Sequence, residues 1–114
     1  MSSYKLNVRT LAAALALLAL PAIGFAADAK ENWKNQCAKC HSADGSGKTA
    51  MGKKLKTKDY TDAKVQESFK DEELLNDINQ GVTKEGKKLM PGYKDKLSAD
   101  ETKALVDLIR SFKK

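Results

Sequence analysis

The sequence predicts an all-α fold with long loops, because two segments carry helical apolar stripes and no segment carries a strand pattern. The stripe nearer the C-terminus has the i, i+3, i+4, i+7 spacing of one face of an amphipathic helix and comprises Leu105, Leu108, Ile109 and Phe112. The other comprises Leu74, Leu75 and Ile78. Sustained alternation of apolar and polar residues with β-branched side chains is not found, so we expect no sheet.

The first helix is expected to begin at Asp28, which is followed three residues later by Glu31 in the spacing of a capping box. Its shared face is formed by Ala29, Trp33, Cys37 and Cys40. Residues 42–58 contain three glycines among lysines and small residues, and they predict an exposed loop.

Three further helices are expected in the second half of the chain. A short one covers residues 61–67, and a middle one covers residues 71–80, with Gly81 placed to end it. The last helix opens with a Ser98-x-x-Glu101 capping box and continues to Phe112.

The N-terminus predicts a secretory signal peptide over residues 1–26. Lys5 and Arg9 form a basic region, residues 11–20 are a run of Leu and Ala, and small residues precede a cleavage site after Ala26. The apolar run is short for a membrane span of about 20 residues, although retention as an uncleaved anchor is the alternative. We expect residues 27–114 to form one small domain whose own apolar side chains make a thin core.

The pentapeptide Cys37-Ala38-Lys39-Cys40-His41 is the signature for covalent attachment of c-type haem. Two thiols three positions apart lie on one face of a helical turn, where each can add to a porphyrin vinyl group. The adjacent His41 then meets the iron as its proximal ligand. We therefore expect one haem c per chain, held by Cys37 and Cys40.

A Cys-x-x-Cys pair can also serve other chemistries. A thioredoxin-like dithiol normally sits at a helix N-terminus, whereas this pair falls toward the end of a predicted helix. Zinc usually takes four ligands, and Cys37, Cys40 and His41 are all the cysteines and histidines of the chain. A structural disulfide in an oxidising compartment is the remaining alternative.

The second axial position of the iron decides the function. With His41 the only histidine, methionine, lysine or an open site remains. Met90 is the better methionine, because Pro91-Gly92 stiffens the chain beside it and it lies between the middle and last helices. Met51, shortly after His41, is expected to be a packing residue. Trp33, Tyr60 and Tyr93 are candidates for hydrogen bonding near the cofactor.

These residues resemble a small single-haem class I cytochrome c of bacterial periplasms. The resemblance covers the region after the signal: the Cys37-to-His41 motif, the glycine-rich loop, Met90-Pro91 and the last helix. It implies a compact fold of three to five helices around one covalent haem, in which the first and last helices cross, and a periplasmic location. Ala29 stands where glycine is common, and Leu108 stands where an aromatic is common, so the crossing is expected to be spaced differently.

Iron held by His41 and Met90 favours outer-sphere transfer of one electron, because no position is open for a substrate. The sequence therefore predicts a soluble periplasmic electron carrier and not an enzyme. Two alternatives stay open. A haem that Met90 does not ligate would suit a peroxidase or a gas sensor, and a retained signal would suit a subunit fixed to a respiratory complex.

Lysines flank both haem segments, and the formal net charge of the chain is +6, falling to +4 without Lys5 and Arg9. The lysines are either a solvated surface or a basic ring that steers the carrier onto acidic redox partners. Such partners would be a membrane quinol-oxidising complex or another donor, and a terminal oxidase or reductase. Neither nucleic acid nor nucleotide is expected, since acidic residues are interspersed and Gly45-Ser46-Gly47-Lys48-Thr49 lacks the first glycine of a P-loop. We expect a monomer.

Overall fold

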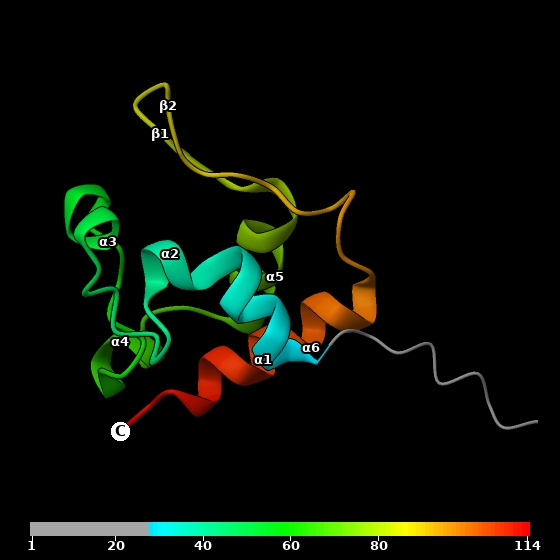
Figure 1. Cartoon of the computed structure of the whole chain (residues 1–114), viewed down its shortest axis with the longest axis horizontal. Coiled ribbons are helices and arrows are strands. Elements are labelled where there is room, and N and C mark those ends of the chain that lie inside the picture. Colours follow the sequence, from blue (N-terminus) through cyan, green and yellow to red (C-terminus); the bar gives the residue numbers. More distant parts are fainter. Residues whose placement is uncertain (1–27) are drawn as a thin grey trace, which may run out of the picture.

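A computed structural model describes residues 28–114 of the chain, and the predicted signal over residues 1–26 lies outside the described residues. The elements in chain order are α1 (Ala29–Asn32), η1 (Trp33–Cys37), α2 (Ala38–His41), α3 (Ala50–Leu55), α4 (Ala63–Glu67), α5 (Asp71–Gln80), β1 (Val82–Lys84), β2 (Lys87–Met90) and α6 (Ala99–Ser111). The fold is mostly helical, as predicted (Figure 1). Counting α1, η1 and α2 as one continuous helix, the described residues form five helices.

The first helix changes its winding before the cysteines. Asp28 caps α1 by accepting a hydrogen bond from the Lys30 backbone N–H. Through η1 the helix has π-type winding, and the Ala38 N–H donates to the carbonyl of Trp33, five residues earlier. The helix ends at His41, because Ser42 takes a left-handed φ of 68°. We call the whole segment from α1 to α2 the attachment helix.

The loop predicted over residues 42–58 contains a short helix, so that prediction was partly wrong. Thr49 caps α3 by accepting from the Gly52 N–H, and Lys56 ends it in the left-handed conformation. The capping signal of Thr49 outweighs the poor helix propensity of glycine within the segment. The predicted helix over 61–67 is confirmed as α4, which begins two residues later behind the cap of Asp62.

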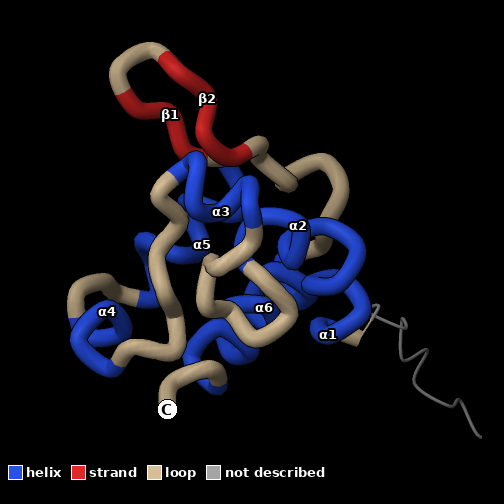
Figure 2. The backbone as a smooth tube through the Cα atoms, turned by 60° about the vertical axis from the view of Figure 1, so that its left-hand side comes forward, coloured by secondary structure: helices blue, strands red, loops and turns tan. Residues whose placement is uncertain are grey.

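The middle helix has the predicted bounds, but the segment after it forms a hairpin. Gly81 ends α5 with a φ of +78°, and β1 and β2 then pair antiparallel with a bulge between Val82 and Thr83. The expectation of no sheet was therefore wrong. A two-residue turn at Glu85 and Gly86, both with positive φ, joins the strands, and the hairpin projects from the helical body (Figure 2).

The last helix, α6, contributes three side chains to the buried apolar core. The predicted capping box is present, with Ser98 and Glu101 each accepting from the backbone N–H of the other. Along its length α6 packs against α1 and against α5, and an amide–carboxylate hydrogen bond of 3.0 Å joins Asn32 to Glu101. The buried apolar side chains of the described residues are Trp33, Tyr60, Phe69, Leu74, Ile78, Tyr93, Leu105, Val106 and Ile109.

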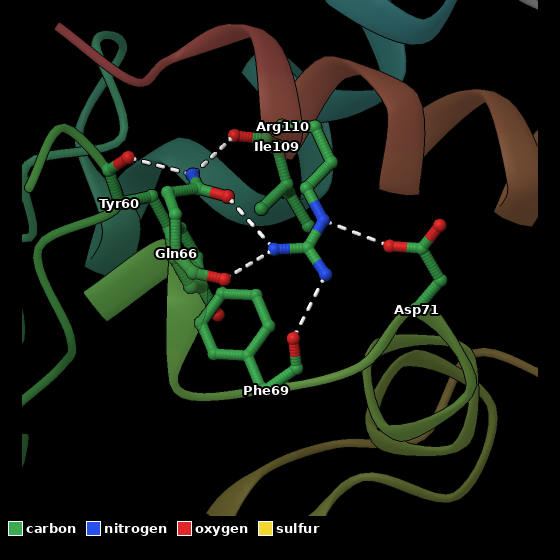
Figure 3. Close-up of polar contacts among 6 residues, drawn as sticks. All are labelled: Tyr60, Gln66, Phe69, Asp71, Ile109 and Arg110. Atoms are coloured by element: carbon green, nitrogen blue, oxygen red, sulfur yellow. Dashed lines mark hydrogen bonds and ion pairs between the residues drawn. The ribbon is translucent and has the colours of Figure 1, made fainter. Parts of the chain in front are cut away.

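A polar cluster fastens α6 to residues 60–71, which include α4 and the first residue of α5 (Figure 3). The buried Gln66 amide donates to the carbonyls of Tyr60 and Ile109, at 2.7 and 2.8 Å. The Arg110 guanidinium donates to the carbonyls of Gln66 and Phe69 and to the Gln66 side-chain oxygen, and it pairs with Asp71 at 2.8 Å. These bonds hold the C-terminal part of α6 against residues 60–71.

Over residues 28–114, the helices are too short or too polar for any of them to cross a bilayer.

Candidate functional site

A cavity of about 800 Å³ opens between the attachment helix, residues 54–60, α5, the hairpin and residues 89–93. The four side chains that the sequence singled out all line it, although they come from two distant parts of the chain: Cys37, Cys40, His41 and Met90. The volume lies within the range of small-molecule and cofactor sites. Met51 is not among the lining residues and is one-third exposed on α3.

The two cysteines are free thiols rather than a disulfide. Burial, together with the neighbouring Cys40, raises the pKa of the Cys37 thiol to about 11. A reactive dithiol depends on a lowered thiol pKa, so the environment of Cys37 does not support thiol–disulfide exchange.

His41 is enclosed between two aromatic rings. Its ring lies 5.4 Å, centroid to centroid, from both Trp33 and Tyr60, and it stacks on the latter. Burial lowers the pKa of His41 to about 4, which keeps the imidazole neutral near pH 7. Within the described part of the chain, its buried Nδ1 has no hydrogen-bond partner. A neutral imidazole that lines a cavity suits a metal ligand.

Met90 is the last residue of β2, and close backbone contacts with α5 hold the segment that contains it. The N–H groups of Tyr93 and Lys94 donate to the carbonyls of Ile78 and Asn79, at 2.8 and 3.2 Å. A Cβ on Gly81 would collide with the Met90 carbonyl. The end of α5 therefore fixes the position from which Met90 reaches the cavity.

Two of the aromatic candidates for hydrogen bonding near the cofactor donate to backbone carbonyls instead. The Trp33 indole N–H donates to Ser42, and the Tyr93 hydroxyl donates to Gln36, both at 2.9 Å. Tyr60 lines the cavity, and burial, with a smaller contribution from Asp77, raises the pKa of its hydroxyl to about 12.

Sequence reasoning did not identify the carboxylates at the cavity. Glu73 and Asp77 line it from α5, one turn apart. Burial raises the pKa of Asp77, Lys58 acts in the opposite direction, and Glu73 adds to the rise. The sequence showed an apolar stripe on α5. It did not show that Glu73 and Asp77, on the same helix, would line a cavity.

The donor set fits a covalently attached haem better than a free metal ion. Two thiols and a neutral imidazole lie on one short helical stretch, and a thioether enters from another segment. The cavity between them is lined by apolar and aromatic residues that include Leu74, Ile78 and Leu105. A large apolar ring would complete the thin core of this small domain.

Comparison with known proteins gives the same family. Residues 24–109 match the family model described as Cytochrome C oxidase, cbb3-type, subunit III. The KustC0563 c-type cytochrome is 34% identical with a TM-score of 0.69, and the match covers 76% of this chain and 99% of that chain. A tyrosine-to-phenylalanine mutant of Kustc0563 is also 34% identical, with a TM-score of 0.66 and coverage of 75% and 99%. No curated protein matches the chain.

The family match spans nearly all of the described residues and includes the whole cavity. The two similar structures share both the fold and a third of the sequence. The chain therefore belongs to the family of cbb3-type cytochrome c oxidase subunit III, and it is a small electron-carrying c-type cytochrome with covalently bound haem c.

Proposed function

We propose that the chain is a soluble periplasmic carrier of single electrons, with haem attached through Cys37 and Cys40 and with His41 and Met90 as axial ligands. The observation that supports this proposal is the convergence of all four side chains on one cavity. His41 belongs to the attachment helix, whereas Met90 arrives on the hairpin strand β2. Two ligands from separate elements suit two faces of one ring.

Bound haem supplies one-electron redox chemistry. His41 offers a neutral nitrogen, and Met90 offers a thioether, which favours the ferrous state relative to a second histidine. When both ligands are in place, a small molecule has no free position at which to bind. The rings of Trp33 and Tyr60 enclose His41. A site with both ligands in place suits electron transfer more than catalysis.

Replacement of Met90 by alanine tests the ligand assignment. We expect Met90→Ala to abolish the sulfur-to-iron charge-transfer band of the ferric protein and to make carbon monoxide bind rapidly to the ferrous protein. Met51→Ala is the matched control, since Met51 lies outside the cavity lining, and it should change neither signal. Rapid carbon monoxide binding by the unaltered protein would contradict the carrier function and favour an open-site haem protein.

A second candidate function is that of a subunit fixed to a respiratory complex. The description of the matched family, which names an oxidase subunit, favours it. The two candidates differ in the fate of residues 1–26. The mass of the exported protein distinguishes them, because a carrier released by cleavage lacks these residues and an anchored subunit retains them.

We further propose that acidic surfaces of redox partners dock at the rim of the cavity. Five lysines line the cavity, two on the hairpin and three in or after the last turn of α3: Lys54, Lys56, Lys58, Lys84 and Lys87. Three carboxylates share this lining, those of Glu73, Asp77 and Glu85, so the protein side chains of the rim carry an excess of positive charge before the haem propionates are counted. Charge of one sign beside the redox centre speeds encounter with oppositely charged partners.

The docking proposal predicts a local dependence on charge. We expect Lys54→Glu to slow oxidation of the ferrous protein by the anionic probe hexacyanoferrate(III) about two- to tenfold at low salt, with the difference vanishing as salt rises. Lys103→Glu, which makes the same charge change in the exposed part of α6 away from the cavity, should have a smaller effect. Equal slowing by both variants would mean that net charge, and not the rim, governs the encounter.

A further inference from the structure

We infer that Tyr93 is a positioning residue for the distal ligand, its hydroxyl tying the Met90 segment to the attachment helix. The hydroxyl donates to the carbonyl of Gln36 at 2.9 Å. Gln36 immediately precedes Cys37, and Tyr93 lies three residues after Met90. The inference rests on the proposed function, because it assumes that Met90 ligates the iron.

The Tyr93–Gln36 hydrogen bond reaches a different element from the other contacts of the Met90 segment. The N–H groups of Tyr93 and Lys94 bind carbonyls of α5, and a Cβ on Gly92 would meet the backbone of the same helix at Asn79 and Gln80. Those contacts hold the segment on α5, but α5 carries neither the cysteines nor His41. The Tyr93 hydroxyl reaches the helix that carries all three.

The acceptor lies where the attachment helix is wound differently from an α-helix. Gln36 belongs to η1, the π-type turn in which the Ala38 N–H reaches back to the carbonyl of Trp33. Short π-type turns often occur at functional sites. Here the turn places the Gln36 carbonyl within hydrogen-bonding distance of a side chain from the Met90 segment.

Burial makes loss of the Tyr93–Gln36 hydrogen bond energetically costly. Tyr93 is only 7% exposed, and a buried hydroxyl without a partner is unfavourable. Movement of the Met90 segment away from the cavity would break the bond and leave the Gln36 carbonyl without this donor. The bond therefore favours the closed arrangement, in which Met90 lines the cavity.

A packing role for Tyr93 makes a different prediction. Its ring belongs to the buried core whether or not the hydroxyl is present, and Lys96 Nζ lies over the ring, 5.8 Å from its centroid. If only the ring mattered, loss of the hydroxyl would not change how readily Met90 leaves the iron. Ligand exchange at the iron separates the two roles.

The test uses the haem-loaded ferric protein and its Tyr93→Phe variant, titrated with imidazole. Imidazole binds only when Met90 has left, so its apparent affinity is proportional to the open fraction. Loss of one hydrogen bond should raise that affinity about two- to tenfold, with a matching loss of the sulfur-to-iron band at lower imidazole concentration. The control is Thr102→Val, which removes another buried hydroxyl bond, to the Ser98 carbonyl at 3.0 Å, away from the cavity.

Three outcomes decide the question. A gain in imidazole affinity in Tyr93→Phe, absent in Thr102→Val, supports the positioning role. An unchanged affinity in Tyr93→Phe, or an equal gain in both variants, overturns it while leaving the proposed function intact. A wild-type ferric protein without the sulfur-to-iron band would overturn Met90 ligation itself, and the positioning role with it.

Discussion

Replacement of Gly52 by alanine is expected to lower the free energy of unfolding of the haem-loaded protein by about 3 kcal/mol, the upper part of the usual range for overpacking. Gly52 is buried in α3, and a Cβ there would collide with the carbonyl oxygens of Cys40 and Gly47. Both obstacles are backbone atoms, so no side-chain rotation relieves the overlap. The Cys40 carbonyl also accepts a hydrogen bond from Thr49 at 2.9 Å, and moving α3 away would break it.

Denaturant unfolding of the haem-loaded protein checks this expectation, with Gly86→Ala as the matched control. Gly86 lies in the hairpin turn at a φ of +75°, and no atom lies within 4 Å of a Cβ placed there. In that variant the only destabilisation should come from the backbone strain of a left-handed alanine, about 1 kcal/mol. A smaller loss for Gly52→Ala than for Gly86→Ala would show that α3 and α2 do not touch as closely as the structure has them.

Replacement of Gln66 by leucine is expected to lower the free energy of unfolding by a similar amount, about 3 kcal/mol. The substitution keeps most of the volume but removes the amide that donates to the carbonyls of Tyr60 and Ile109. Each buried carbonyl left without its donor should cost about 1 to 3 kcal/mol. Arg110 also loses its bond of 3.1 Å to the side-chain oxygen of Gln66.

The exposed ion pair of the same cluster provides the comparison. Asp71 is 60% exposed in its side chain and Arg110 is 31% exposed, and exposed pairs of this kind are worth at most about 1 kcal/mol. Asp71→Asn should therefore shift the unfolding midpoint much less than Gln66→Leu does. If the two variants were equally destabilised, the salt bridge would contribute as much as the buried amide to holding α6 in place.

Local signals in the sequence were enough to predict most of the helices. The helix over 71–80 was predicted with its observed bounds because an apolar stripe and a stopping glycine coincide there. The box at Ser98 and Glu101 likewise marked the start of α6. Each of these signals acts within a few residues, so the rest of the molecule is not needed to interpret it.

The two missed elements had weaker local signals. In α3 the cap of Thr49 is offset by Gly52, whose presence is explained only by the carbonyls of Cys40 and Gly47 across from it. The hairpin turn uses Glu85 at a positive φ, where Asn or Asp would have been the usual signal. Both elements depend on contacts that are distant in sequence or on a rare backbone conformation.

The candidate site likewise contains residues that the sequence predicts and a contact that it does not predict. The cysteines and His41 were identified from one pentapeptide, and Met90 was preferred over Met51 from its Pro-Gly neighbours. The bond from Tyr93 to Gln36 spans 57 residues and ends on a backbone carbonyl, which any residue type would provide. No pattern in the sequence marks such an acceptor, so only the three-dimensional structure identifies it.

The π-type turn from Trp33 to Cys37 also constrains how the attachment helix can vary in length. Its first part, α1, packs against α6, and its last part, α2, packs against α3, so one continuous helix contacts two different neighbours. An α-helix advances by about 100° per residue. Insertion or deletion of a single residue in this turn would therefore rotate the cysteines and His41 by about that angle relative to the α6 contact. The π-type turn therefore sets the rotation about the helix axis between α1, which contacts α6, and α2, which carries Cys40 and His41.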